Sequence, residues 1–132
     1  MSILTSTRTR LTTYWITTAL VAFSLGLGGV GDVLRMKPVV EGMAILGYPA
    51  YFCVILGIWK LLGTVTILAP GLPRLKEWAY AGIVFDFTGA AASHFVVGDS
   101  MGVMVAALVL TGLAFASWSL RPSSRRLDGP IW

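Results

Sequence analysis

Ionisable residues and cysteine are scarce in this chain of 132 residues. Only 12% of the residues are charged, about half the share of a typical soluble domain, whereas 56% are hydrophobic and the mean hydropathy is +0.80. So few charges cannot cover a water-soluble surface of this size, and the composition therefore predicts a membrane protein. The single cysteine, Cys53, excludes an intrachain disulfide, a Cys-x-x-Cys redox motif and a thiolate metal cluster.

Strong metal ligands are equally scarce, since His94 is the only histidine. A zinc site needs three or four ligands, so no metal site is expected. Heme with two axial ligands would need a second strong ligand, for which Met101 and Met104 are weak candidates. No nucleophile–base–acid signature appears. The net charge of +4 comes from basic residues between apolar runs, so no nucleic-acid partner is expected.

Long apolar runs dominate the chain instead. Four of them have the roughly 20 residues that a helix needs to cross the bilayer core. They predict a single all-α domain over residues 1–132, a bundle of four transmembrane helices with a lipid bilayer as its surroundings. The predicted spans are residues 11–30, 50–69, 78–97 and 101–120. Residues 35–48 are too few and too polar to span, so a short interfacial helix on the outer face is expected there.

The basic residues give an expected orientation, because Lys and Arg near span ends stay on the cytoplasmic side. Only Arg35 and Lys37 lie on the opposite side, so both termini are predicted to be cytoplasmic. The Ser-Ser-Arg-Arg tail at residues 123–126 is expected to be a solvated anchor that lipid phosphates attract. Seven basic residues lie on the predicted cytoplasmic side: Arg8, Arg10, Arg74, Lys76, Arg121, Arg125 and Arg126.

A glycine-rich segment ends the first predicted span. Residues 26–31 match the dinucleotide-binding pattern G-x-G-x-x-G, but no strand precedes them and the position expected to be acidic is Tyr51. We interpret the segment as a packing surface by which membrane helices approach one another closely. The small residues on one narrow helical face are Thr17, Ser24, Gly28 and Gly31.

Two ionisable residues, Lys60 and Asp86, lie near the middle of predicted spans, where a charge is costly and needs a partner. The breaker sequence Pro-Gly-Leu-Pro at residues 70–73 forces a tight reversal between these spans. At 1.5 Å per residue, the depths of the two residues on either side of this reversal agree to about one helical turn. Antiparallel neighbours would then place the ammonium beside the carboxylate.

Each of these charges lies on a stripe of small or polar residues with helical spacing. Two interpretations stay open: a buried ion pair that fixes the register of the helices, or a ligand or proton site. The stripe of the second span is Cys53, Gly57, Lys60 and Thr64, and that of the third is Gly82, Asp86, Gly89 and Ser93.

His94 is a third candidate for ligand binding or proton relay beside Lys60 and Asp86, and the secondary polar candidates are Asp32, Glu41 and Glu77. His94 flanks the Asp86 face about two turns nearer the outer surface, where it is either a proton relay with Asp32 as a neighbour or a hydrogen-bonded packing residue. Glu41 is a candidate to cover the outer opening of the bundle. Glu77 is interpreted as a favourable charge near a helix N-terminus.

Several of these motifs together resemble the DoxX-like family of small bacterial membrane proteins. They are Trp-Lys-Leu-Leu-Gly at 59–63, the segment from Pro70 to Gly82, Phe-Asp-Phe-Thr-Gly-Ala at 85–90, Ser-His at 93–94 and Leu-Gly-Tyr-Pro at 46–49. The resemblance implies a four-helix protein of the inner membrane. It also implies that the polar core consists of Lys60, Glu77, Asp86 and His94.

Relatives in this family include a small subunit of a thiosulfate–quinone oxidoreductase and a membrane component linked to thiol and superoxide handling. The lone Cys53 departs from relatives that use cysteine pairs, so disulfide exchange by this chain is not expected.

Three functions remain open on the sequence, and none of them identifies a reaction. The first is a redox-associated subunit that binds a quinone or another apolar small molecule at Lys60, Asp86 and His94. The second is a non-enzymatic assembly or chaperone-like protein whose glycine stripes bind another membrane protein or a second copy. The third is a proton-coupled transporter, which would have to form a dimer. An occupied pocket beside Lys60 and Asp86 would favour the first or third, and a dry, directly bonded pair the second.

Overall fold

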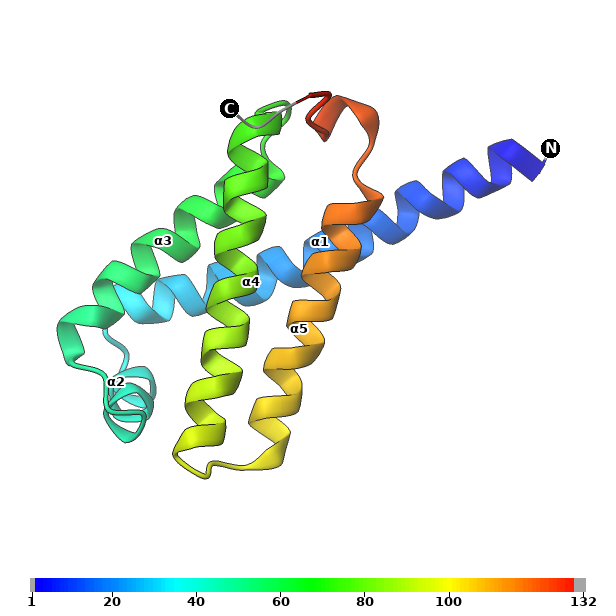
Figure 1. Cartoon of the computed structure of the whole chain (residues 1–132). Helices are drawn as coiled ribbons and strands as arrows, with labels where there is room; N and C mark the ends of the chain where they lie inside the picture. Colours follow the sequence, from blue (N-terminus) through cyan, green and yellow to red (C-terminus); the bar gives the residue numbers. More distant parts are fainter. Residues whose placement is uncertain (1, 130–132) are drawn as a thin grey trace.

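The computed structural model describes residues 2–129, and these fold into five α-helices and one short 3₁₀ helix without a strand. α4 and α5 run antiparallel beside each other, and α1 crosses them at an angle (Figure 1). α3 packs mainly on α1 and more loosely on α4. The elements are α1 Ser2–Val33, α2 Lys37–Ile45, α3 Ala50–Leu68, α4 Pro73–Val96, α5 Met101–Leu120 and η1 Ser123–Arg125.

The helix ends follow local backbone chemistry. α5 has the bounds that the apolar run predicts. α3 ends at Leu68 because Ala69, which precedes Pro70, is extended. α4 begins before its predicted span, at Pro73, because a proline fits the first position of a helix. The helix expected between the first two spans is confirmed as α2.

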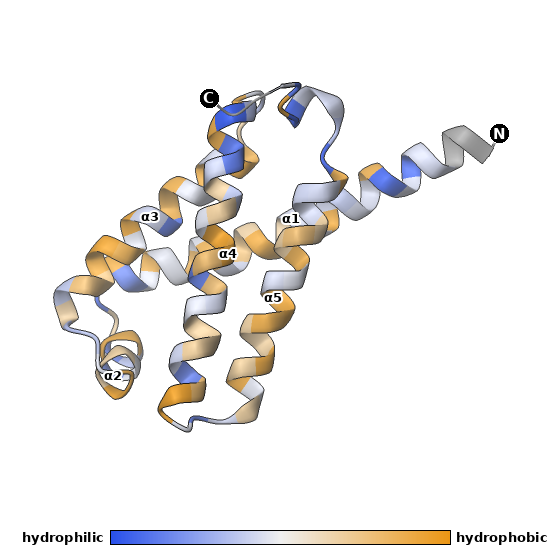
Figure 2. Ribbon diagram, in the orientation of Figure 1, coloured by the Kyte–Doolittle hydropathy of each residue, from blue (hydrophilic) through white to orange (hydrophobic). Residues whose placement is uncertain are grey.

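In the part of the chain that the structure describes, three helices are long and apolar enough to cross a membrane: Ser6–Val33 within α1, and α3 and α5. α4 has 24 residues, about 36 Å of helix, but it includes Lys76, Glu77 and Asp86 and is not among the three. Figure 2 shows the hydrophilic residues interrupting α4, whereas α5 is mostly hydrophobic. The predicted four-span bundle is thus supported for three of its helices.

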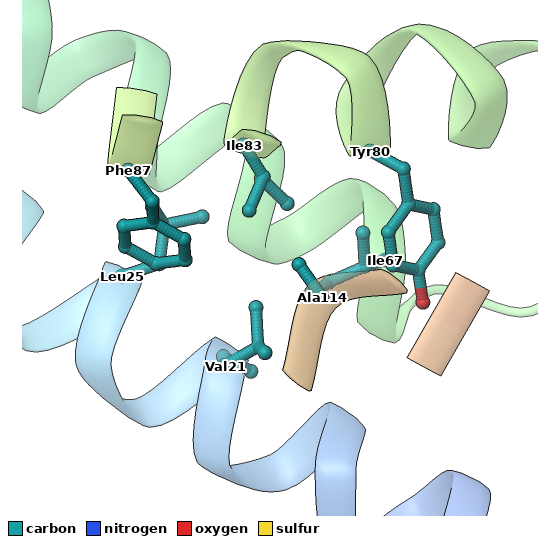
Figure 3. Packing of buried hydrophobic residues seen from close by; sticks show 8 residues of the cluster. Val21, Leu25, Ile67, Tyr80, Ile83, Phe87 and Ala114 are labelled. Carbon is teal, nitrogen blue, oxygen red and sulfur yellow. The ribbon is translucent and has the colours of Figure 1, made fainter. Parts of the chain in front are cut away.

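The packed core lies where α1, α4 and α5 meet the end of α3. Figure 3 shows its side chains pointing toward one another from these four helices. Many other large apolar side chains face outward; Phe23 is 70% exposed, Phe85 73% and Val96 81%. An outer surface of this kind fits hydrocarbon surroundings, because lipid tails are as apolar as these side chains and no hydrophobic effect drives their burial. The core residues are Val21, Ala22, Leu25, Ile67, Tyr80, Ile83, Phe87 and Ala114.

Glycines let α1 and α3 approach closely, as the sequence predicted, but they are not the glycines of the expected stripe. A Cβ added at Gly57 would lie 2.8 Å from both the Gly29 carbonyl oxygen and the Asp32 Cβ. A Cβ at Gly28 would touch only the Lys60 ammonium, at 3.9 Å. The face of α1 that packs on α3 therefore contains Gly29, one residue along the chain from the Gly28 of the expected stripe.

Candidate functional site

A buried salt bridge lies at the crossing of α1 and α3. The Lys60 Nζ donates a hydrogen bond of 2.8 Å to the Asp32 Oδ2, and the two side chains are 19% and 6% exposed. The predicted direct pair between Lys60 and Asp86 was therefore wrong, because Lys60 lies on the same stripe as Gly57 and that stripe packs on α1. Because no side chains separate α1 and α3 where their glycines meet, Asp32 of α1 lies within reach of Lys60.

Asp86 faces a cavity between α3 and α4 instead. The cavity has a volume of about 540 Å³, and it is lined by Lys60, Asp86 and Thr66 among mainly apolar residues. A Cβ added at Gly82, which lines the cavity one turn away from Asp86, would meet nothing within 4 Å, so this glycine helps to leave the space open. The apolar lining includes Leu56, Trp59, Leu62, Leu75, Trp78 and Ile83.

Ionisable side chains from three helices lie at this cavity, because Lys60 and Asp86 line it and Asp32 is bound to Lys60. Lys60 and Asp32 form the salt bridge, and both act electrostatically on the partly buried Asp86. Within residues 2–129, Asp86 makes no hydrogen bond and no salt bridge of its own. An apolar cavity with a few convergent polar groups is the usual form of a small-molecule site. The site therefore contains both a directly bonded ion pair, Lys60 with Asp32, and a pocket beside it.

A hydrogen bond joins the loop between α2 and α3 to α4. The Tyr48 hydroxyl and the Ser93 Oγ lie 2.8 Å apart, and the Tyr48 ring stacks on Phe52 with 5.2 Å between centroids. Ser93 belongs to the same stripe of α4 as Asp86, so this bond ties the stripe to the loop that precedes α3.

His94 does not join the cluster. It lies eight positions from Asp86, about 12 Å along the helix, and its Nδ1 is 2.8 Å from the Asp99 Oδ2 in the turn before α5. The backbone N–H of Ser100 and then His94 hold the pKa of Asp99 below its usual value. The predicted neighbour of His94, Asp32, is bound to Lys60, so the expected proton relay has no connection through these residues.

Glu41 does not cover the cavity either. Its side chain is 63% exposed and lies 3.9 Å from Lys37, one turn away on α2. It is not among the residues that line the cavity. The helix that carries it is present, but this carboxylate is exposed and does not line the cavity.

Basic residues at the end of α3 and the start of α4 are buried, which the sequence interpretation missed. Arg125 is 9% exposed and donates to two carbonyl oxygens at the end of α3, at 3.0 and 3.2 Å. Lys76 is fully buried and donates to the carbonyl oxygens of Ala69 and Gly71 in the turn between α3 and α4. Free carbonyls at a helix C-terminus attract cations, so the tail folds back over α3 and is not a solvated anchor.

Glu77 does more than stabilise the start of α4. Its Oε1 accepts a hydrogen bond from Arg121, and its Oε2 accepts one of 2.8 Å from the Trp118 indole. The carboxylate therefore fastens α4 to the end of α5. Glu77 therefore has a structural role in holding α4 to α5, and it does not line the cavity.

A family comparison covers the elements that build the site. Residues 16–117 match the model of the DoxX-like family, a range that contains Asp32, Lys60 and Asp86. No curated protein and no solved structure matches the chain. The family match spans most of the sequence and stops before the basic tail. The chain therefore belongs to the DoxX-like family.

Proposed function

We propose that this protein is a membrane-embedded binding subunit that holds an apolar small molecule, in the first place a quinone, in the cavity between α3 and α4. The observation that carries the proposal is the apolar cavity with Lys60 and Asp86 on its wall. Its volume of about 540 Å³ falls within the range of small-molecule pockets. The arrangement supports binding of a redox molecule and assigns no catalytic step to the chain.

The salt bridge prepares Lys60 for such a ligand. An ammonium group has three N–H donors, and Asp32 accepts only one of them. The remaining donors suit a carbonyl oxygen of a quinone ring, while the salt bridge limits the positions that the flexible lysine can adopt. Asp32 is therefore a positioning residue and Lys60 a ligand-contacting one.

The cavity also suits a ligand that arrives from lipid. Trp59 and Trp78, on the two helices that flank it, are 68% and 70% exposed. In a membrane these rings would face hydrocarbon or the interface. A quinone dissolved in the bilayer could then enter between the helices without crossing water.

Quinone binding to the purified protein in lipid nanodiscs tests the proposal. A decyl-tailed benzoquinone should quench the fluorescence of Trp59 and Trp78 with a saturable dependence on concentration. Replacing both Asp32 and Lys60, as Asp32→Asn with Lys60→Met, removes the two opposite charges of the salt bridge together and should weaken binding at least tenfold, about 1.4 kcal/mol. Leu108→Met on the exposed face of α5 is the control. Unsaturable quenching, or equal affinity in the double variant, would refute the proposal.

We also propose that α4 is the fourth span of an inner-membrane protein with both termini in the cytoplasm. The antiparallel course of α4 and α5, and the basic residues near the turn at residues 70–72, support this topology. Reporter enzymes active only outside the cytoplasm, inserted after residue 71 or after residue 99, should be active only at the second position. Activity at both or at neither would contradict it.

An assembly role is the second candidate, favoured by the direct bond between Asp32 and Lys60 at the α1–α3 crossing. Such a pair can set helix register without a ligand. In that case a second copy or another membrane protein would be the partner. Cross-linking in native membranes should then give a discrete higher-mass species, and a monomer alone would argue against this role.

A further inference from the structure

The cluster beside the cavity contains one more acidic group than basic groups. Asp32 from α1 and Lys60 from α3 neutralise each other, and Asp86 from α4 has no partner within residues 2–129. α5 carries no ionisable residue that could supply a counter-charge. The nearest other titratable group on α4, Tyr80, points away and hydrogen-bonds to Ser117.

The cost of this excess charge depends on what fills the cavity. Water solvates an ionised carboxylate, whereas a neutral, largely apolar ligand removes that solvation and offers nothing comparable in return. A protonated carboxyl group does not carry this cost, and its O–H can donate to an acceptor on the ligand. Ligand entry and protonation of Asp86 should therefore favour each other.

On the basis of the proposed function, we propose that Asp86 takes up one proton from the medium when a neutral carbonyl-bearing ligand enters the cavity, and then donates a hydrogen bond to that carbonyl. The carboxylate and the proton form a carboxylic acid, and no electron is transferred in this step. Lys60, held by Asp32, supplies the second donor to the ligand head. The site thus selects neutral molecules with hydrogen-bond-accepting heads.

Coupling of this kind makes ligand affinity dependent on pH. Above the pH at which Asp86 ionises without ligand, the Kd should rise by up to about tenfold per pH unit, the limit for uptake of one proton. The benzoquinone does not titrate between pH 5 and 9, so the change must come from the protein. Asp86→Asn, which is permanently neutral and can still donate, should bind with the native low-pH affinity at every pH.

Fluorescence quenching by the decyl-tailed benzoquinone in nanodiscs, measured from pH 5 to 9, tests the coupling, and a pH indicator in weak buffer counts the protons taken up on binding. The control is Asp99→Asn, because Asp99 is a carboxylate in the turn before α5, outside the cavity; it should keep the native pH profile. A pH-independent Kd in the native protein, or an unchanged slope in Asp86→Asn, overturns this inference while leaving quinone binding intact. Absence of saturable binding at every pH overturns both proposals.

Discussion

Gly57→Ala should separate the two helices that hold the salt bridge. A methyl group at this position lies 2.8 Å from the Gly29 carbonyl oxygen, the Asp32 Cβ and a Val33 methyl carbon. Comfortable carbon contacts need about 3.5–4.0 Å, so α1 and α3 must move apart by several tenths of an ångström. Overpacking of this kind costs about 1–3 kcal/mol, while replacing a helical glycine by alanine gains up to about 1 kcal/mol.

Gly112→Ala is the matched control, because a Cβ at Gly112 in α5 would meet nothing within 4 Å. Both variants gain the same helix propensity, so the difference between them isolates the overpacking. Unfolding in mixed micelles with increasing dodecyl sulfate, followed by circular dichroism, should show Gly57→Ala less stable than Gly112→Ala by about 1–3 kcal/mol. Equal stability of the two variants would refute the close crossing, and with it the reason why Lys60 meets Asp32.

Two further predictions concern the buried basic residues. Arg125→Met removes two hydrogen bonds to the end of α3 and the contact with the Trp15 ring at 4.9 Å, so the free energy of unfolding should fall by about 1.5–3 kcal/mol. In the same assay the control Arg8→Met, on the exposed start of α1, should change the free energy of unfolding little. Equal losses in the two variants would contradict the role of Arg125 in capping α3. Desolvation, then Arg125 and Arg121, lower the pKa of Lys76 from 10.5 to about 8, so the unfolded chain binds more protons between these values and the Tm should rise from pH 8 to about 10.5 and stay level below pH 8. Lys76→Met should abolish that rise, and an identical rise in the variant would show that another group causes it.

Helix positions were predictable because hydrophobicity and helix-breaking residues act locally along the chain. The apolar run at 101–120 is α5, and the Pro-Gly-Leu-Pro sequence ends one helix and starts another. The mixed segment at 35–48 contains α2, since it is amphipathic but too short to span. None of these outcomes depends on which helices touch.

The partner of Lys60 was not predictable by the same means. Matching depth along antiparallel helices is necessary for a pair, and both acidic residues satisfy it once α1 is seen to continue to Val33. The choice between them depends on which face of α3 packs on α1. Gly57, on the Lys60 face, makes the close contact, whereas Gly82 on α4 faces open space and leaves a cavity.

The fate of the basic tail also depended on tertiary structure. The charge pattern identified Arg121 and Arg125 as residues near a membrane surface, an expectation that treats each charge separately. In the fold, Arg125 hydrogen-bonds to carbonyl oxygens at the end of α3, which lie far from it in the sequence and could not be inferred from the charge pattern. Folding back satisfies both the cation and the helix terminus.

By itself, the sequence determined that the chain is a helical membrane protein, where its helices lie and which few charges must be accommodated among them. Each of these properties follows from the residues of a local segment of the chain. Only the tertiary structure decided that Lys60 binds Asp32, that Asp86 is left beside a cavity and that His94 stands apart. A change of one position turns a helical face by about 100°, so contacts between helices depend on rotations and crossings that hydrophobicity along the chain leaves undetermined.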